Sequence, residues 1–334
     1  MNRYAYRLPG SKEIKTGGSD TLLPGLHPGG FYVKPFDGNE GFTIPATPSA
    51  GSVTHVPLQY IIPKESTTRE RHAAGIKHIL EKIGDGMLDK CVLARVDVNR
   101  SLPDAEAVFR ALCDAYPSAF VFGFRTPETG TWIGASPELL LSKSGRTLTT
   151  MALAGTRPAG TCGEWDEKNR EEQAIVRNYI AGILENHGCE VKIHPTETAQ
   201  AGPVEHIRNM ITAIMPCRNN TSSAGQKEDG LETAARVADS LSPTPALCGS
   251  PREEAFTAIN EAEDFRRGCY GGCCGPVSED GAAFDIYVNL RSMCIKDGVT
   301  CLFAGGGIVA GSEPDSEWHE TERKLSTIKN LVPF

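Results

Sequence analysis

Two acidic residues and a lysine near the C-terminal end of the sequence have the spacing of one helical face. Glu317, Glu320 and Lys324 stand at positions i, i+3 and i+7, so an α-helix would bring two carboxylates and an ammonium to the same side. An ordinary solvated face with one ion pair is the simplest interpretation of such a set. However, Trp318 and Leu325 mark the neighbouring face as buried. The carboxylates are therefore expected close to the core, where a cation would offset the cost of burying their charge.

A second source of carboxylates is the pair Glu171–Glu172. Acids in the first turns of a helix stabilise the helix dipole, and this effect alone would account for them. Mg²⁺ prefers oxygen ligands and takes only one or two protein carboxylates, leaving its other positions to water and substrate oxygens. Glu172 together with Glu320 would be enough for a Mg²⁺ site.

Three consecutive glycines, Gly305–Gly307, precede the predicted helix that carries Glu317. The run is not a phosphate-binding loop, because no Gly-Lys-Ser/Thr follows it. It is not a dinucleotide fingerprint either, because Ala310 occupies the place of the last glycine. The favoured interpretation is a strand end that another group approaches closely, and that group could be a ligand.

The segments that must position these residues mix helices and strands without the alternation of a doubly wound fold. Strands are predicted where β-branched and aromatic residues cluster, and helices where apolar residues recur every three or four positions. This pattern indicates an α+β fold with antiparallel sheet, and it includes a hairpin about residues 296–298. The predicted strands are 90–98, 119–126, 131–136, 138–153 and 284–306, and the predicted helices are 71–86, 167–186, 204–215 and 316–330.

Composition narrows the classes of partner. The 334 residues carry a formal charge of -8, which argues against nucleic acid or an anionic membrane as a partner. The eleven cysteines show no tandem C-x-x-C pairs, and the first residues lack the apolar core of a signal peptide, so a cytoplasmic protein is expected. The polar stretch 217–232 could be a domain linker, but a surface loop is preferred because matching apolar segments flank it.

Several sequence blocks, in order, resemble those of the chorismate-utilising enzymes. The last block, residues 304–324, is similar to the family pattern A-G-x-G-I-V-x-x-S-x-P-x-x-E-W-x-E-T-x-x-K. This family contains the anthranilate, aminodeoxychorismate, isochorismate and salicylate synthases. The other blocks are KCVLAR at 90–95, GASPELLL at 134–141, LAGTRPAG at 153–160, PTPALCGSPREEA at 243–255, RGCYGG at 267–272 and NLR at 289–291.

The resemblance also indicates the nucleophile. Aminodeoxychorismate synthases of the family carry a lysine where this chain has Ala154, so their covalent route is excluded. Members that use water have a lysine at the start of the K-V-V-L-A-R block, and this chain has Lys90 there. The resemblance therefore implies that water attacks chorismate.

The resemblance assigns roles to five residues. Lys90 would take a proton from the water that attacks C2 of chorismate, and Glu138, with a raised pKa, would protonate the departing C4 hydroxyl. Mg²⁺ would be held by Glu172 and Glu320, with Glu317 contributing through water. Without the resemblance, Lys90 would be interpreted as a solvated strand-end lysine and Glu138 as a turn residue.

The remaining implied contacts concern the substrate. The backbone at Gly155 and Thr156, together with Lys324, would assist at the ring carboxylate, and Tyr270 and Arg291 would hold the enolpyruvyl carboxylate. Glycine at 305 would let the backbone approach the ligand. The complete implied substrate-binding set is Gly155, Thr156, Ala246, Leu247, Tyr270, Arg291, Gly305 and Lys324.

The resemblance implies one catalytic domain, residues 1–334, with a shortened N-terminal region 1–63. Its expected fold is two packed, mostly antiparallel sheets flanked by helices, as in anthranilate synthase component I. The expected activity is that of a monomeric, Mg²⁺-dependent isochorismate synthase feeding menaquinone or siderophore synthesis. A salicylate synthase is the alternative. A chorismate-binding protein or subunit with little turnover is a second alternative, because Ser242 and Gln173 replace histidines that are usual in the family.

Histidine 206 lies in the predicted helix 204–215. Because a histidine in an amphipathic helix can be buried with its hydrogen bonds satisfied, His206 is interpreted as a structural residue.

Overall fold

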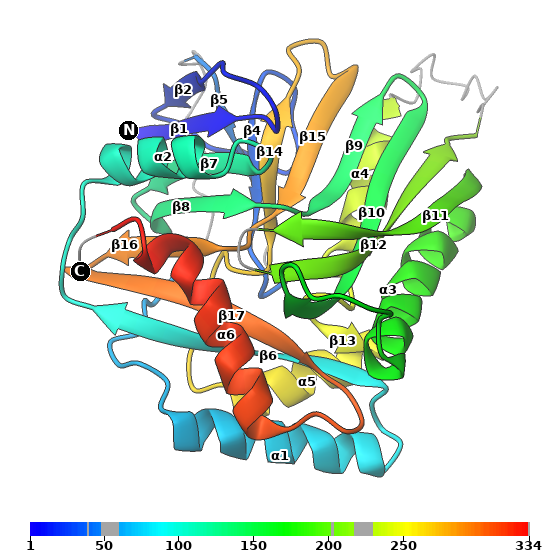
Figure 1. Cartoon of the computed structure of the whole chain (residues 1–334). Coiled ribbons are helices and arrows are strands. Elements are labelled where there is room, and N and C mark those ends of the chain that lie inside the picture. Colours follow the sequence, from blue (N-terminus) through cyan, green and yellow to red (C-terminus); the bar gives the residue numbers. More distant parts are fainter. Residues whose placement is uncertain (39, 48–59, 202–203, 217–229, 333–334) are drawn as a thin grey trace.

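Antiparallel pairing organises the chain into two sheets (Figure 1). The computed structural model describes residues 1–38, 40–47, 60–201, 204–216 and 230–332. Most of the polar stretch 217–232 therefore lies outside the described residues. The first sheet has the strand order β13 (Gly249–Ser250), β6 (Lys90–Asn99), β17 (Val299–Ile308), β16 (Ser292–Lys296), β8 (Gly130–Ser136), β7 (Phe120–Thr126), β1 (Asn2–Arg7) and β2 (Lys15–Ser19).

The second sheet is also antiparallel. Along the chain, groups of its strands alternate with groups of strands from the first sheet. Its strand order is β11 (Glu190–Ala201), β12 (Val204–Ile214), β10 (Thr147–Pro158), β9 (Leu139–Ser144), β15 (Ala283–Val288), β14 (Cys273–Val277), β4 (Gly30–Lys34), β5 (Phe42–Pro45) and β3 (Leu23–Pro24).

An aromatic core joins the inner faces of the two sheets. Side chains alternate across a strand, so β7 turns Phe120, Phe122 and Phe124 to the same inner face. Phe120 stacks on Tyr287 of the second sheet with 4.2 Å between ring centroids. Burying large aromatic surfaces from both sheets contributes strongly to stability and fixes their separation.

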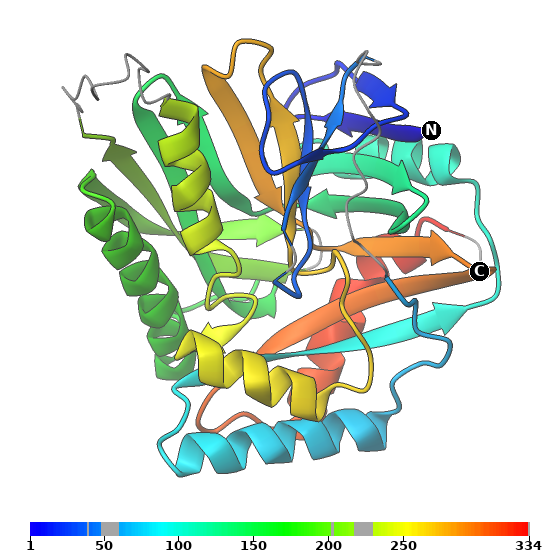
Figure 2. The same ribbon diagram turned by 180° about the vertical axis from the view of Figure 1, so that it is seen from behind.

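Helices cover the outer sides (Figures 1 and 2). The core beneath α2 and α6 includes Phe109, Leu112, Leu325 and Ile328, which pack on the outer face of the first sheet. Helices α3 and α4 pack on the second sheet, and α1 and α5 pack beside β6. The helices are α1 (Arg69–Gly84), α2 (Ala105–Ala115), α3 (Glu167–Asn186), α4 (Gly230–Leu241), α5 (Arg252–Ala262) and α6 (Pro314–Lys329).

The predicted fold class is confirmed, since two packed antiparallel sheets carry flanking helices. Strand 90–98, helix 167–186 and the hairpin about 296–298 also agree with the structure. In that hairpin Asp297 and Gly298 have φ values of 48° and 78°, as the tight turn between β16 and β17 requires. Among the helices of the described residues, none combines the length and the apolar character needed to cross a bilayer.

The predicted helix 204–215 is wrong, because this segment is strand β12. It pairs with β10 on one side and β11 on the other. Ile207 and Ile211 are four residues apart, which fits a helix, but both also lie on one face of a strand. Asn209 occupies the buried position between them and hides the alternation that would have indicated β structure.

Candidate active site

A cavity lies between the β6–β17 part of the first sheet and the β10–β12 part of the second. All eight predicted substrate-binding residues line it, together with Glu138, Glu172 and His206. The structure thus brings together residues that the sequence scatters from 138 to 324, although their individual roles stay predictions. The remaining lining residues are Val92, Pro137, Leu153, Ala154, Leu290, Phe303, Ala304 and Gly307.

Lys90 opens β6 and is completely buried next to this cavity. Its Nζ lies 2.7 Å from Oε1 of Glu172 on α3. A fully buried ammonium needs such a partner, because the cost of removing it from water is otherwise prohibitive. The alternative interpretation of Lys90 as a solvated strand-end residue is therefore wrong.

Glu138 presents a buried carboxyl group to the cavity. Only 4% of the residue is exposed, and its backbone N–H donates to Ser136 Oγ across 3.3 Å. Burial raises the pKa of Glu138 to about 8, against the opposing effect of the positive charges on Lys90, Lys324 and Arg291. Glu138 is therefore protonated at neutral pH and can donate a proton.

The two acids of α6 are each paired with a lysine. Glu317 accepts from Lys168 at 2.9 Å, and Glu320 accepts from Lys324 at 2.6 Å. Burial and the charge of Glu320 raise the pKa of Glu317, while Lys168 opposes this shift. Burial also acts to raise the pKa of Glu320. The positive charge and hydrogen bond of Lys324 outweigh burial, so the pKa of Glu320 is lowered. Helix α6 thus holds a buried acid, Glu317, and a half-buried acid, Glu320, whose pKa values are shifted in opposite directions.

The glycine run is what gives these acids room. A Cβ at Gly306 would lie 3.2 Å from Glu317 Oε2 and 3.5 Å from Glu320 Oε1, so both oxygens point at one spot beside the strand. A Cβ at Gly307, on the opposite face of β17, would overlap Glu172 Oε1. The expectation of a close approach to this strand end is met by these carboxylates.

The carboxylate oxygens of Glu317 and Glu320 are of the kind that binds Mg²⁺. Two carboxylates converge beside Gly306, and hard oxygen ligands of this kind are those that Mg²⁺ takes. In the part of the chain that the structure describes, no three carboxylate, imidazole or thiol groups meet around one point. Water and substrate oxygens would have to complete the coordination shell, which is normal for Mg²⁺.

Replacing Gly307 by alanine is expected to lower activity severely while the protein still folds. The new Cβ would meet Glu172 Oε1 and would lie 2.9 Å from Lys90 Cε, so it would displace that ion pair. Gly123→Ala is the matched control. Gly123 lies in another strand of the same sheet, and its Cβ would make an ordinary contact of 3.6 Å with Phe109. Steady-state turnover and thermal melting measure the two effects. Equal activities of the two variants would contradict the expectation.

Gly155 and Thr156 form a bulge-like turn within β10, where its pairing with β12 shifts register, and α3 holds it in place. Gly155 has φ +70°, a value that favours glycine, and the Thr156 N–H donates to Asn169 Oδ1 at 2.9 Å. This amide is therefore engaged within the protein. The predicted help from the backbone at this turn cannot come from the Thr156 N–H in this arrangement.

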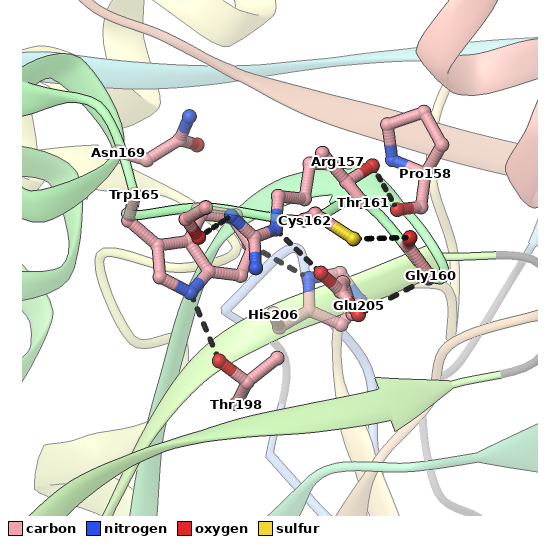
Figure 3. Close-up of polar contacts among 12 residues, drawn as sticks. Arg157, Pro158, Gly160, Thr161, Cys162, Trp165, Asn169, Thr198, Glu205 and His206 are labelled. Carbon is pink, nitrogen blue, oxygen red and sulfur yellow. Dashed lines mark hydrogen bonds and ion pairs between the residues drawn. The ribbon is translucent and has the colours of Figure 1, made fainter.

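A set of contacts fastens the segment that joins this turn to α3 (Figure 3). The Arg157 guanidinium lies over the Trp165 ring, 4.0 Å from its centroid, and forms an ion pair with Glu205 of β12. Trp165 Nε1 donates to Thr198 Oγ1 of β11 at 3.0 Å. Segment 159–166 is thus tied to the edge of the second sheet beside the cavity.

Sequence reasoning missed the place of His206. It lies on a strand, is buried and lines the cavity, so the helix predicted at this residue is wrong. Burial lowers the pKa of His206 to about 3, and the charges of Arg291 and Lys324 act in the same direction. The signal that could have found it is the strand register: His206 pairs with Ala199 of β11 and directly precedes Ile207, which pairs with Ala154 of β10.

The two departures from the family pattern do not line the cavity. Gln173 Nε2 donates to Ala152 O at 2.9 Å and to Asn209 Oδ1 at 3.0 Å within the core under α3. The Ser242 side chain is hydrogen-bonded to Cys273. The reason for suspecting low turnover from these two positions is correspondingly weaker.

The comparisons with known proteins agree with this geometry. A family model described as "Chorismate binding enzyme" matches residues 46–332. The vibriobactin-specific isochorismate synthase of Vibrio cholerae serotype O1 is 32% identical over 319 residues, which are 89% of this chain and 78% of that protein. Isochorismate synthase MenF of Escherichia coli K12 is 31% identical over 286 residues, 80% of this chain but 63% of that protein.

Solved structures support the same fold. The DhbC protein of Bacillus anthracis superposes with a TM-score of 0.80 at 25% identity, covering 99% of this chain and 96% of that one. Anthranilate synthase component I of Streptococcus pneumoniae superposes with a TM-score of 0.70 at 15% identity, covering 97% and 89%. At that identity the second match concerns the fold alone.

Proposed function

Because the chain belongs to the chorismate-binding enzymes, we propose that it is an Mg²⁺-dependent isochorismate synthase. The observation that carries the proposal is the pairing of a buried acid with a buried amine at one cavity: Glu138 is protonated at neutral pH, and Lys90 is the positive charge that acts on it most strongly. An acid and a base on one substrate are what exchange of a hydroxyl group by water requires.

Lys90 and Glu138 each carry out one proton transfer. Lys90 accepts a proton from water as the water oxygen bonds to C2 of chorismate. Glu138 donates its proton to the C4 oxygen as the bond from C4 breaks, and the ring double bonds shift between the two carbons. One water is added and one is released, so atoms and charge balance.

The Lys90–Glu172 ion pair sets a condition for this chemistry. An ammonium paired with Glu172 offers no lone pair, so this contact has to open before Lys90 can take a proton from water. Glu172, Glu320 and Glu317 would hold Mg²⁺, which when bound would supply positive charge for the ring carboxylate.

The substrate contacts proposed for the remaining residues follow from their chemistry. Arg291 can grip a carboxylate with two parallel N–H donors, and Tyr270 can add its hydroxyl. Lys324 reaches the cavity next to Gly305, whose carbonyl accepts from it at 2.8 Å. Ala246 and Leu247 supply apolar wall. A cytoplasmic monomer in menaquinone or siderophore synthesis belongs to the same proposal.

Incubating the purified protein with chorismate and Mg²⁺ tests the function directly. Isochorismate as the accumulating product supports the proposal. Salicylate together with pyruvate would replace it by a salicylate synthase, and chorismate that stays unchanged although it binds would replace it by a binding protein.

Glu320→Gln is expected to raise the Mg²⁺ concentration needed for half-maximal activity by about tenfold or more, because an amide is a weaker ligand for a hard cation. Glu322→Gln is the matched control on the same helix, since Glu322 pairs with Arg95 instead. Titrating activity with Mg²⁺ measures both. An unchanged Mg²⁺ requirement in Glu320→Gln would remove this residue from the metal site.

A further inference from the structure

The imidazole of His206 contacts two parts of the cavity wall at once. Nδ1 lies 2.9 Å from the carbonyl oxygen of Gly155 and 3.2 Å from Thr156 Oγ1. Nε2 lies 3.3 Å from Nη2 of Arg291. One side chain on β12 thereby connects the turn within β10 with the arginine that follows β15.

These partners determine where the proton sits on the ring. A carbonyl oxygen can only accept, so Nδ1 must carry the hydrogen that it shares with Gly155. A guanidinium can only donate, so Nε2 must offer its lone pair to Arg291. His206 is therefore the neutral Nδ1–H tautomer. The charged groups that act on the ring are Arg291, Lys324 and Glu320, and a second proton on the ring would face the guanidinium directly.

Arg291 is oriented by its backbone and by side-chain contacts. Its backbone is in the left-handed region with φ 47°, which is uncommon outside glycine and fixes the start of the side chain. Nη1 donates to Thr327 Oγ1 at 3.3 Å, and Nη2 faces His206. The guanidinium is buried and lines both the cavity and a second, adjoining cavity that His206 also lines. The contact between Nη2 and His206 is therefore one that sets how the guanidinium lies between the two cavities.

We propose that His206 is a positioning residue, whose neutral Nε2 holds the Arg291 guanidinium in the orientation that grips a substrate carboxylate. The inference rests on the proposed function for the identity of the substrate. Its core is independent of that identity, because any carboxylate ligand of Arg291 would depend on the same hydrogen bond.

Two amide variants separate the contacts of the ring. In His206→Asn the amide nitrogen can replace Nδ1 toward Gly155, while nothing reaches Arg291. In His206→Gln the longer side chain can place its carbonyl oxygen where Nε2 was. We expect His206→Asn to raise KM for chorismate about tenfold with kcat changed less than threefold, because a contact to a carboxylate that does not react affects ground and transition states alike. We expect His206→Gln to stay within about threefold of the wild type.

The KM values of the two variants distinguish a positioning role of His206 from a packing role. A KM increase in His206→Asn that is rescued in His206→Gln supports the proposal. Unchanged KM in both variants, or an equal loss of kcat and melting temperature in both, overturns it and leaves His206 as a packing residue. If the wild type does not convert chorismate, the proposed function fails, and NMR of histidine labelled with ¹⁵N still tests the inference. The Nδ1–H tautomer at pH 6 to 8 is expected for His206, and an Nε2–H tautomer or a protonated ring would overturn it.

Discussion

Glu138→Gln is expected to lower kcat for isochorismate formation by about 10²–10⁴-fold, the range for loss of a general acid. Glutamine has nearly the same shape and keeps the cavity packed, but it has no acidic proton for the departing hydroxyl. Chorismate binding should persist, because the carboxylate-binding residues are unchanged. Turnover at saturating chorismate and Mg²⁺ measures the effect, with the exposed Glu279→Gln as control. A variant that retained more than a tenth of wild-type activity would exclude Glu138 as the acid.

The pKa of Glu138 gives this prediction a pH signature. An acid with a pKa of about 8 is protonated below that pH, so wild-type kcat/KM should fall as pH rises through about 8. In the unfolded chain the same carboxyl group loses its proton near pH 4.5. The free energy of unfolding therefore falls as pH rises from about 4.5 to 8, and this group causes no further fall above pH 8. Glutamine avoids this loss. Glu138→Gln should therefore be more stable than wild type by about 3 kcal/mol at pH 7, and denaturant unfolding at pH 5 and pH 8 would show the difference growing.

Lys90→Ala is the second variant with a large expected effect. Loss of the base should lower kcat by about 10²–10⁴-fold. The substitution also leaves the Glu172 carboxylate without its buried partner, which costs about 3–5 kcal/mol of stability. Activity must therefore be measured at a temperature where the variant is shown to be folded, by circular dichroism for example.

Two controls separate lost chemistry from lost stability at Lys90. Lys143→Met removes another buried lysine, one whose Nζ donates to the carbonyls of Gly281 and Ala282 at 3.2 and 2.9 Å, away from the cavity. It should destabilise the protein without a comparable loss of kcat. Small primary amines added to Lys90→Ala should restore part of the activity, because they can occupy the vacated space and accept the proton. Full activity of folded Lys90→Ala would show that another group is the base.

The sequence predicted the site better than it predicted the local structure around it. The motif blocks identified Glu138, Glu172 and eight substrate-binding residues that line one cavity, because their spacing is visible in the chain itself. Lys90, Glu317 and Glu320 are not among the residues that line it. The i, i+4 spacing made the Glu320–Lys324 pair visible. The Lys168–Glu317 pair was not visible, since its members are far apart in sequence and meet only through the packing of α3 near α6. The raised pKa of Glu138 was expected from its role, but its cause, burial, appears only in the folded protein.

The error at 204–215 has the same origin. Local periodicity could not distinguish helix from strand there, because the polar Asn209 is buried and satisfied by Gln173 of α3 and by β11. Once the segment is placed as β12, His206 turns toward the cavity. A wrong period for one segment thus concealed a residue that lines the cavity. Helix α3 was predicted with its observed bounds because its apolar residues recur every three or four positions from Val176 to Leu184.

The position of β17 within its sheet has a consequence for how the protein is made. It lies between β6 and β16, and Val96 of β6 pairs with Phe303 of β17, so the sheet is completed by a segment that the ribosome synthesises after the other strands. Until then the growing chain carries an unpaired, apolar β6 edge, which is the kind of surface that chaperones bind and that aggregates. The first sheet therefore cannot close before β17 has been synthesised.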